Sequence, residues 1–233
     1  MTLPAIKPGD HVAAVGQTGS GKSVLLQELI KQAVTAPVFV MDSKIDEGFL
    51  SLARPDETLI VFDEGLDKFA RYIAQAPRKI ADYVIIRPPL DEVTDPDTLD
   101  EYVLLIHTRF KHPCIIVIDE LYMLHKNGRA GPGLSGALTR GRSKKHSLYG
   151  ATQRPSWISR FCISEMSHYF VFRLMEVDDR KRFSHIGYDK NKMLDRYHYY
   201  AYDSKSGESG EFPPLNISKS EYSDNTDEKG RWL

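Results

Sequence analysis

The sequence of 233 residues has little cysteine, no long apolar run and almost no net charge. Its two cysteines lie far apart in apolar surroundings, without the spacing of a disulfide framework or a zinc site. No stretch approaches the roughly 18 consecutive apolar residues of a membrane-spanning helix. The start, MTLPAIKPGD, lacks the basic and apolar regions of a secretory signal. We therefore expect a cytoplasmic protein with no transmembrane segment of its own, whose cysteines are small core residues.

Charge is unevenly distributed along the chain, although the net charge of −1 argues against a general nucleic-acid binder. The segment 126–160 holds eight Lys or Arg and no acidic residue. The segment 91–101 holds six acidic residues and no base. The acidic run is typical of a solvated surface, whereas the basic segment is a candidate for a functional role.

Short apolar stretches alternate with helical patterns along most of the chain. Continuous rather than alternating apolar strands, separated by helices, predict an α/β fold with a mostly parallel sheet and helices on both faces. The expected strands are 11–16, 37–42, 58–63, 82–87, 114–120, 147–153, 168–174 and 198–203, and the main expected helices are 22–34, 66–76 and 96–110.

Two segments are predicted to be irregular. Residues 127–136, NGRAGPGLSG, hold four glycines and a proline, which predicts a mobile surface loop. Polar residues dominate from residue 203 onward, and we expect an extended or disordered arm from Ser218. The expected organisation is one domain, 1–203, followed by a short irregular tail, 204–233.

Residues 16–23, GQTGSGKS, match the phosphate-binding pattern G-x-x-x-x-G-K-[ST] between an expected strand and an expected helix. Glycines let successive backbone N–H groups turn toward phosphate oxygens, and the start of the helix adds its positive dipole end. Lys22 is expected to reach the β- and γ-phosphates of ATP, and the Ser23 hydroxyl to bind Mg²⁺. The expected nucleotide-binding residues are Gly16, Gln17, Thr18, Gly19, Ser20, Gly21, Lys22, Ser23 and Val24.

An acidic pair ends the most apolar stretch, CIIVIDE at 114–120. Asp119 is placed to hold the magnesium ion through water, and Glu120 to polarise the attacking water. Many kinases carry only the first acid, so the pair favours hydrolysis coupled to mechanical work. Asp63 and Glu64 show the same local pattern after a shorter strand and rank second.

The stretch YGATQRP, 149–155, ends a further expected strand. The Gln153 amide would lie within reach of the γ-phosphate, where it can report hydrolysis to the chain that follows. Arg142, upstream in the basic segment, is expected to be exposed and far from its own phosphate loop. Such an arginine can reach the γ-phosphate bound by a neighbouring subunit.

These motifs together resemble the FtsK/HerA superfamily of hexameric DNA-pumping ATPases. The resemblance covers about residues 10–185 and rests on GQTGSGKS, IIVIDE, RGRSKKHSLYGATQRPS and SHYFVFRL followed by Asp178-Asp179-Arg180. MDSK, 41–44, is similar to an Asp-x-Lys motif of the superfamily, although serine replaces the commoner proline. Within the FtsK/HerA superfamily, the short chain looks most like the genome-packaging ATPases of tailless, internal-membrane phages (tectivirus-like) and related archaeal viruses.

The resemblance implies a RecA-like ATPase core in a homohexameric ring, with ATP and Mg²⁺ as cofactors and double-stranded DNA in the pore. It implies an arginine finger in trans, best carried by Arg142 with Arg140 as the alternative. Other implied partners are capsid-vertex or membrane proteins of the virion, and the implied location is the host cytoplasm or a virion vertex. The candidate contacts to DNA phosphates are Lys126, Arg129, Arg140, Lys144 and Lys145. Two alternatives stay open: a cellular or plasmid translocase of conjugation or repair, and a non-motor P-loop NTPase or kinase.

Overall fold

A computed structural model describes residues 3–33, 37–75 and 81–215. Within these residues, one sheet of nine strands has the order β11-β10-β9-β1-β8-β5-β2-β4-β3. The seven strands from β9 to β3 run parallel, whereas β10 and β11 are antiparallel additions at one edge. The strands are β1 (Val12–Val15), β2 (Val38–Met41), β3 (Leu59–Phe62), β4 (Tyr83–Ile86), β5 (Cys114–Ile118), β8 (His146–Thr152), β9 (His168–Phe172), β10 (Tyr199–Asp203) and β11 (Ser209–Phe212).

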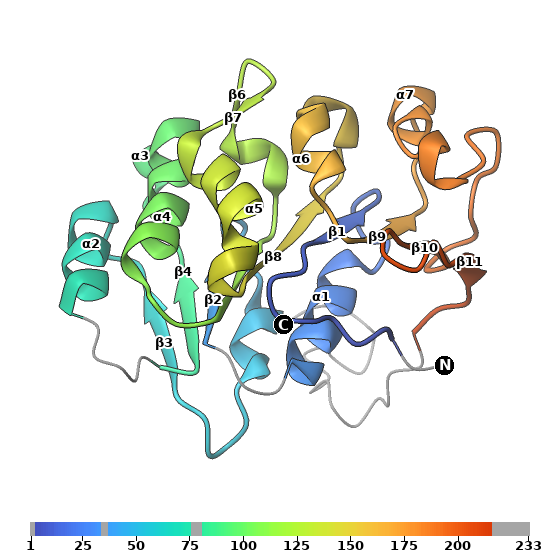
Figure 1. Ribbon diagram of the computed structural model, residues 1–233. Coiled ribbons are helices and arrows are strands. Elements are labelled where there is room, and N and C mark those ends of the chain that lie inside the picture. Colours follow the sequence, from blue (N-terminus) through green and yellow to red (C-terminus); the bar gives the residue numbers. More distant parts are fainter. Residues whose placement is uncertain (1–2, 34–36, 76–80, 216–233) are drawn as a thin grey trace, which may run out of the picture.

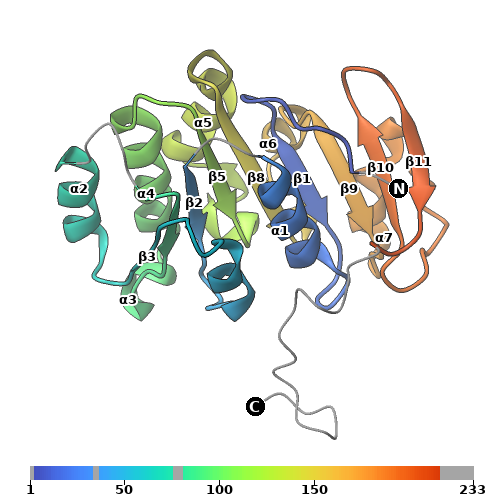
Figure 2. The same ribbon diagram turned by 90° about the horizontal axis from the view of Figure 1, so that it is seen from below.

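Helices cover both faces of the sheet. Figure 1 shows α1 (Lys22–Gln32) and η1 (Glu47–Leu52) below it, with most other helices above it. Figure 2 shows the same sheet from below, with α1 in front of the central strands. The remaining elements are α2 (Leu66–Gln75), α3 (Leu90–Val93), α4 (Pro96–Arg109), η2 (Leu121–Leu124), β6 (His125–Lys126), β7 (Arg129–Ala130), α5 (Pro132–Lys144), η3 (Pro155–Trp157), α6 (Arg160–Ser164), α7 (Val177–Lys181) and η4 (Ser184–Ile186).

The central strands are apolar throughout because both of their faces are buried. In β1, Val12 and Ala14 pack into the core on the α1 side. Ala13 and Val15 pack into the core on the other side. Successive side chains of a strand point to opposite faces, so a strand between two helical layers needs an apolar residue at every position. The expected α/β fold with a mostly parallel sheet is confirmed.

The carboxyl-terminal part extends the sheet past residue 203, where we expected the domain to end. Strand β11 pairs with β10 through the register Tyr199↔Phe212 to Tyr202↔Ser209. Residues 216–233, which include the arm expected from Ser218, lie outside the described residues. In the described part of the chain, no helix combines the length and the apolar character that crossing a membrane requires.

The expectation of a mobile loop at 127–136 is wrong. The first half of this segment forms the turn of the β6–β7 hairpin and strand β7, and helix α5 begins at Pro132. A Cβ atom on Gly133 would lie 2.2 Å from the Asp100 carbonyl oxygen of α4, so glycine allows the two helices to approach closely. The buried Asp100 carboxylate accepts the N–H groups of Gly133 and Leu134 at 2.7 Å each and so caps α5. Gly133 therefore serves helix packing rather than mobility.

Candidate nucleotide-binding site

The phosphate loop leaves the centre of the sheet at the carboxyl end of β1. The Gly16 N–H donates to the Thr152 carbonyl of β8 at 3.1 Å, and the Gln17 N–H donates to the Arg173 carbonyl at 2.9 Å. Both neighbouring strands thus hold the start of the loop. Gly21, the residue before α1, has φ 104°, a left-handed value that favours glycine. The loop is therefore fixed at both ends, with the first turn of α1 directly behind it.

Lys22 is folded back over its own loop. Its Nζ donates to the Gly16 carbonyl at 2.8 Å and to the Gln17 carbonyl at 2.9 Å. Burial, together with the positive charge of Lys44, lowers the pKa of Lys22 from its usual 10.5 to about 8. An anionic phosphate group at the loop would offer this ammonium group a stronger partner than the two carbonyl oxygens.

Asp119 and Glu120 follow β5, which lies next to β8 and one strand away from β1. They are 2% and 1% exposed. Burial raises the pKa of Asp119, and the positive charge of Lys44 acts against this rise. The Lys44 Nζ lies 2.8 Å from Glu120 Oε2 and 3.5 Å from Asp119 Oδ2. Lys44 therefore binds both carboxylates of the acidic pair.

Lys44 is the residue whose part in the site the sequence left open. It follows β2, the strand beside β5, so the adjacency of two strands far apart in sequence brings it to the acids. Its neighbour Asp42 is fully buried and pairs with Arg87, with Nε and Oδ2 2.9 Å apart. The signal in the sequence was a lysine just past the end of a buried strand, within the motif 41–44.

Gln153 connects the phosphate loop to the acidic pair. Its side-chain Oε1 accepts a hydrogen bond of 2.6 Å from the Thr18 hydroxyl. Its backbone N–H donates to Glu120 Oε1 at 3.2 Å. Residues that follow β1, β5 and β8 thus meet in one hydrogen-bonded chain at the carboxyl ends of three strands, the position at which open α/β sheets bind ligands.

The donor set around the loop fits a magnesium ion. Asp119 Oδ2 is buried and, apart from its 3.5 Å ion pair with Lys44, has no hydrogen-bond partner among the described residues. Ser23, in the first turn of α1 directly after Lys22, supplies a hydroxyl oxygen. The described residues contain no cluster of three His, Cys, Asp or Glu side chains that could enclose a metal. Mg²⁺ suits such a site, because it is usually bound by one or two protein oxygens, waters and substrate phosphates.

The second acidic pair, Asp63-Glu64, lies elsewhere. It follows β3 at the far edge of the sheet, and four strands separate β3 from β1. Glu64 forms an exposed ion pair with Lys68, with Oε1 and Nζ 2.9 Å apart. The structure therefore does not bring this pair to the phosphate loop.

Sequence comparison identifies a relative. The DNA packaging ATPase P9 of Enterobacteria phage PRD1 is 38% identical over 181 residues, which are 78% of this chain and 71% of P9. The chain belongs to the P9 family. This agrees with the superfamily resemblance of the motifs, although no protein-family model matches the chain.

Solved structures share the fold. The genome packaging NTPase B204 of Sulfolobus turreted icosahedral virus 2, in complex with ATP-gammaS, has a TM-score of 0.65 at 19% identity and covers 90% of this chain and 100% of its own. VirB4 of Thermoanaerobacter pseudethanolicus has a TM-score of 0.64 at 8% identity, covering 91% and 90%. At these identities the likeness is one of fold alone.

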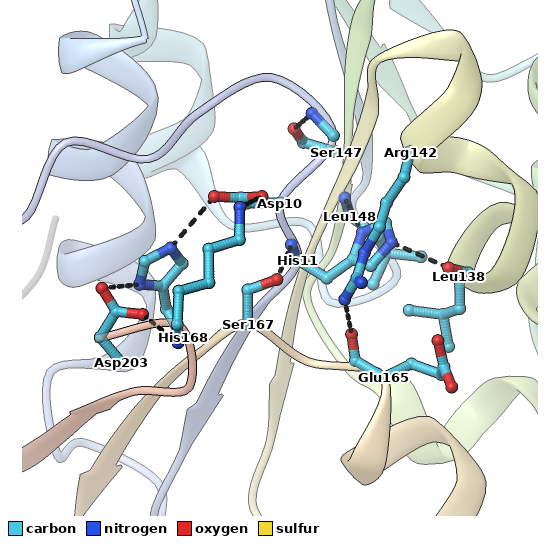
Figure 3. Close-up of polar contacts among 12 residues, drawn as sticks. Asp10, His11, Leu138, Arg142, Ser147, Leu148, Glu165, Ser167, His168 and Asp203 are labelled. Carbon is cyan, nitrogen blue, oxygen red and sulfur yellow. Dashed lines mark hydrogen bonds and ion pairs between the residues drawn. The ribbon is translucent and has the colours of Figure 1, made fainter. Parts of the chain in front are cut away.

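Arg142 lies at the opposite end of the sheet from the phosphate loop. It is in the last turn of α5, just before the first residue of β8. Gln153 lies at the other end of β8, directly after its last residue. Figure 3 shows its guanidinium group beside Glu165, whose carbonyl oxygen accepts from Nη2 at 3.2 Å. Burial, together with the positive charge of Arg142, lowers the pKa of the nearby His11 to about 4. Arg142 is exposed and outside its own subunit's phosphate site, as is Arg140 two residues before it.

The five predicted DNA contacts do not form a single cluster. Lys126 forms an ion pair with Asp97, and the Lys144 Nζ donates to the His107 carbonyl at 2.7 Å. Lys145 ends α5 in a left-handed conformation with φ 58°. Arg129 and Arg140 are exposed on the β6–β7 hairpin and on α5. These side chains are thus spread over the hairpin and the second half of α5.

Proposed function

We propose that this chain is the ATPase that packages a double-stranded DNA genome into a preformed viral capsid. Its relative of 38% identity is a DNA packaging ATPase of a phage, and its structural neighbour B204 is a viral genome packaging NTPase. In this proposal the protein works in the host cytoplasm or at a virion vertex, beside capsid-vertex or membrane proteins of the virion.

The chain of contacts from Thr18 through Gln153 to Glu120 is the observation that carries the proposal. It links the loop that holds the phosphates with the carboxylate that can accept a proton from water. Attack of that water on the γ-phosphorus breaks the bond to the bridging oxygen, and ADP leaves while Glu120 takes the proton. Lys22 and the loop N–H groups stabilise the charge of the transferring phosphoryl group.

Ser23 and Asp119 would hold the magnesium ion, Asp119 through water. The ion, when bound, neutralises charge on the β- and γ-phosphate oxygens. Lys44 positions Glu120 through its 2.8 Å ion pair. Gln153 loses its Thr18 partner when a γ-phosphate takes its place, and the change passes to the residues that follow Gln153.

A ring of six copies would complete the site. Arg142, in the last turn of α5, lies at the end of β8 far from its own phosphate loop, but it is exposed and can enter the site of a neighbour. We assign it the role of the trans arginine finger, with Arg140 as the alternative. Such a finger stabilises the charge that develops in the transition state.

The decisive experiment is the ATPase rate with and without double-stranded DNA. We expect DNA to stimulate the wild type, and Lys22→Ala and Arg142→Ala each to abolish most of the hydrolysis. Arg71→Ala, on the exposed side of α2, is the control for loss of an arginine and should behave like wild type. Mixing the two inactive variants should restore some activity, because some interfaces then combine an intact loop with an intact finger.

Two results would change the proposal. If Arg142→Ala keeps full activity, the finger is elsewhere and Arg140→Ala is the next variant. If DNA does not stimulate ATP hydrolysis by the wild type, a non-motor NTPase becomes the better interpretation. A conjugation or repair motor would also be stimulated by DNA. Co-purification of the protein with procapsids during infection would distinguish a packaging motor from these two.

A further inference from the structure

Five of the six residues that line a cavity of about 350 Å³, on the face of the sheet opposite α1, have cationic or polar side chains. Its walls come from α6 and from the segment of α7 and η4, which stand side by side on the upper face in Figure 1. The lining residues are Arg160, Ile163, Ser164, Lys181, Arg182 and His185. None of them is acidic, so the positive charge of this pocket is not balanced from within. We call it the α6–α7 pocket.

The carboxylates near the α6–α7 pocket either bind groups outside the pocket or form only weak ion pairs with its cations. Asp179 accepts the Ser156 N–H at 2.8 Å and lies 3.8 Å from Arg154. Asp178 pairs with Lys181 at 2.9 Å, but both side chains are more than half exposed, and such pairs contribute little. Arg160 makes no ion pair with any described residue. An anion in the pocket would therefore meet cations without displacing a strong partner.

Arg182 is held in a fixed position at the wall of the pocket. Its Nε donates to the Pro155 carbonyl at 3.3 Å, and its Nη2 donates to the carbonyls of Ser156 and Ile158. Its Nη1 donates to none of the described residues and stays available. Burial lowers the pKa of Arg182, and the charge of Arg160 lowers it further while Asp179 opposes the change. The two guanidinium groups thus repel each other, and a shared anion would relieve that repulsion.

The pocket suits a phosphate group and not a base. It has no aromatic side chain on which a base could stack apart from His185, and its donors are charged groups without a recognition pattern. Arginine and lysine that meet phosphates without reading bases give binding that is independent of sequence. A motor that moves along any DNA needs this kind of contact.

We propose that the α6–α7 pocket binds a backbone phosphate of double-stranded DNA and that Arg182 links this contact to the nucleotide site. Few residues separate Arg182 from the nucleotide site. Arg182 donates hydrogen bonds to carbonyl oxygens within 155–158, and this segment begins two residues after Gln153. Gln153 contacts both the phosphate loop and Glu120. The inference rests on the proposed function, because it takes DNA as the ligand.

The test compares two double variants of equal charge change in the full chain. Arg160→Gln/Lys181→Gln removes two cations from the pocket without touching the nucleotide site. Lys68→Gln/Arg71→Gln removes two from α2, where Lys68 also pairs with an exposed carboxylate. Binding of a short duplex of mixed sequence is followed by fluorescence anisotropy at several salt concentrations. ATP hydrolysis without DNA is measured for each protein as a check of folding.

We expect the pocket variant to bind DNA roughly tenfold more weakly at moderate salt, with the slope of log affinity against log salt reduced by about 2. The control variant should bind DNA with the affinity of the wild type, and its slope of log affinity against log salt should differ by no more than about half a unit. Equal behaviour of the two variants would overturn the inference. A wild type that hydrolyses no ATP, or binds no DNA, would instead overturn the proposed function, so the two failures are distinguishable.

A second arm separates DNA from a small anion. Thermal unfolding is compared in inorganic phosphate and in chloride at equal ionic strength, for the wild type and the pocket variant. Any effect at the phosphate loop is common to both proteins. If phosphate stabilises the wild type more, while DNA affinity is the same in both, the pocket is a small-anion site and the DNA assignment is wrong.

The link through Arg182 has its own variant. Arg182→Lys keeps the charge but loses the forked contacts to three carbonyls. We expect DNA affinity to change by less than about threefold, whereas stimulation of hydrolysis by DNA is lost. Stimulation equal to that of the wild type would show that Arg182 does not carry the coupling.

Discussion

Lys44 and Glu120, 76 residues apart in sequence, form an ion pair in which Nζ and Oε2 are 2.8 Å apart. The same ammonium group lies 3.5 Å from Asp119. One lysine therefore holds both the proposed metal ligand and the proposed base. Burial lowers the pKa of Lys44, but the two carboxylates more than compensate and raise it, so the lysine stays charged at neutral pH.

Replacement of Lys44 should weaken magnesium-dependent hydrolysis most strongly at low pH. The positive charge of Lys44 opposes the rise in the pKa of Asp119 that burial causes, so Lys44→Ala raises that pKa further. A carboxylate must be deprotonated to bind a metal, so the Mg²⁺ concentration needed for half-maximal rate should increase, more at pH 6 than at pH 8 by roughly tenfold. Lys44→Arg retains the charge and is the control. An identical magnesium requirement in Lys44→Ala and wild type at both pH values would refute this role.

ATP affinity should fall as the pH rises above about 8. Burial and the charge of Lys44 lower the pKa of Lys22 to about 8, whereas a bound phosphate favours the charged form and raises this pKa. Above about pH 8, binding must therefore take up a proton, and affinity should fall by up to about tenfold per pH unit until the pKa of the bound state is reached. Calorimetry near pH 9 in two buffers of different ionisation enthalpy measures this uptake. Lys22→Arg, which cannot lose its proton, should bind with no such pH dependence.

Glu120→Gln should abolish hydrolysis and preserve ATP binding. Loss of a general base typically costs about 10²- to 10⁴-fold in rate, and the amide keeps the size of the side chain. Glu64→Gln is the matched control, since Glu64 ends the same local Asp-Glu pattern but lies at the far edge of the sheet. Single-turnover hydrolysis and nucleotide binding by filter retention measure the two effects. A loss of rate in Glu64→Gln of similar size would contradict the assignment.

Two glycines of α5 should respond differently to alanine. In Gly133→Ala the new Cβ would meet backbone atoms of α4 at 2.2 and 2.7 Å, which must separate the helices and should cost roughly 3 kcal/mol or more. In Gly136→Ala the nearest atoms are side-chain atoms at 3.3 Å, and helix propensity favours alanine by about 1 kcal/mol. Urea unfolding of both variants gives the comparison. Equal loss of stability would show that the contact with Asp100 does not limit the packing.

Most of the sheet was predictable because a strand buried on both faces is apolar at every position. This pattern can be recognised in the strand's own sequence, without knowledge of its neighbours. The stretch CIIVI at 114–118 is apolar at every position, and it forms β5 as expected. The phosphate loop was predictable for a similar reason: its glycines, Lys22 and Ser23 act within eight consecutive residues. Each of these features is local in sequence.

Features that depend on contacts between distant segments were not predictable. The glycines at 127–136 suggested a loop because composition cannot tell a flexible glycine from one that lies against a neighbouring helix. The sequence favoured Asp119 over Asp63 from the length and apolar character of its strand, but the order of strands that separates the two acidic pairs comes from the structure. The cations of the α6–α7 pocket come from two segments about twenty residues apart and carry no motif.

The hydrogen bond between Thr18 and Gln153 joins two side chains that the proposed hydrolysis would have to separate. An incoming γ-phosphate must compete with this 2.6 Å contact, at a cost of about 1 kcal/mol, before it can engage Gln153. In the proposed mechanism, the two side chains can form this contact again after inorganic phosphate departs. Each turnover would then end in the same geometry from which it began.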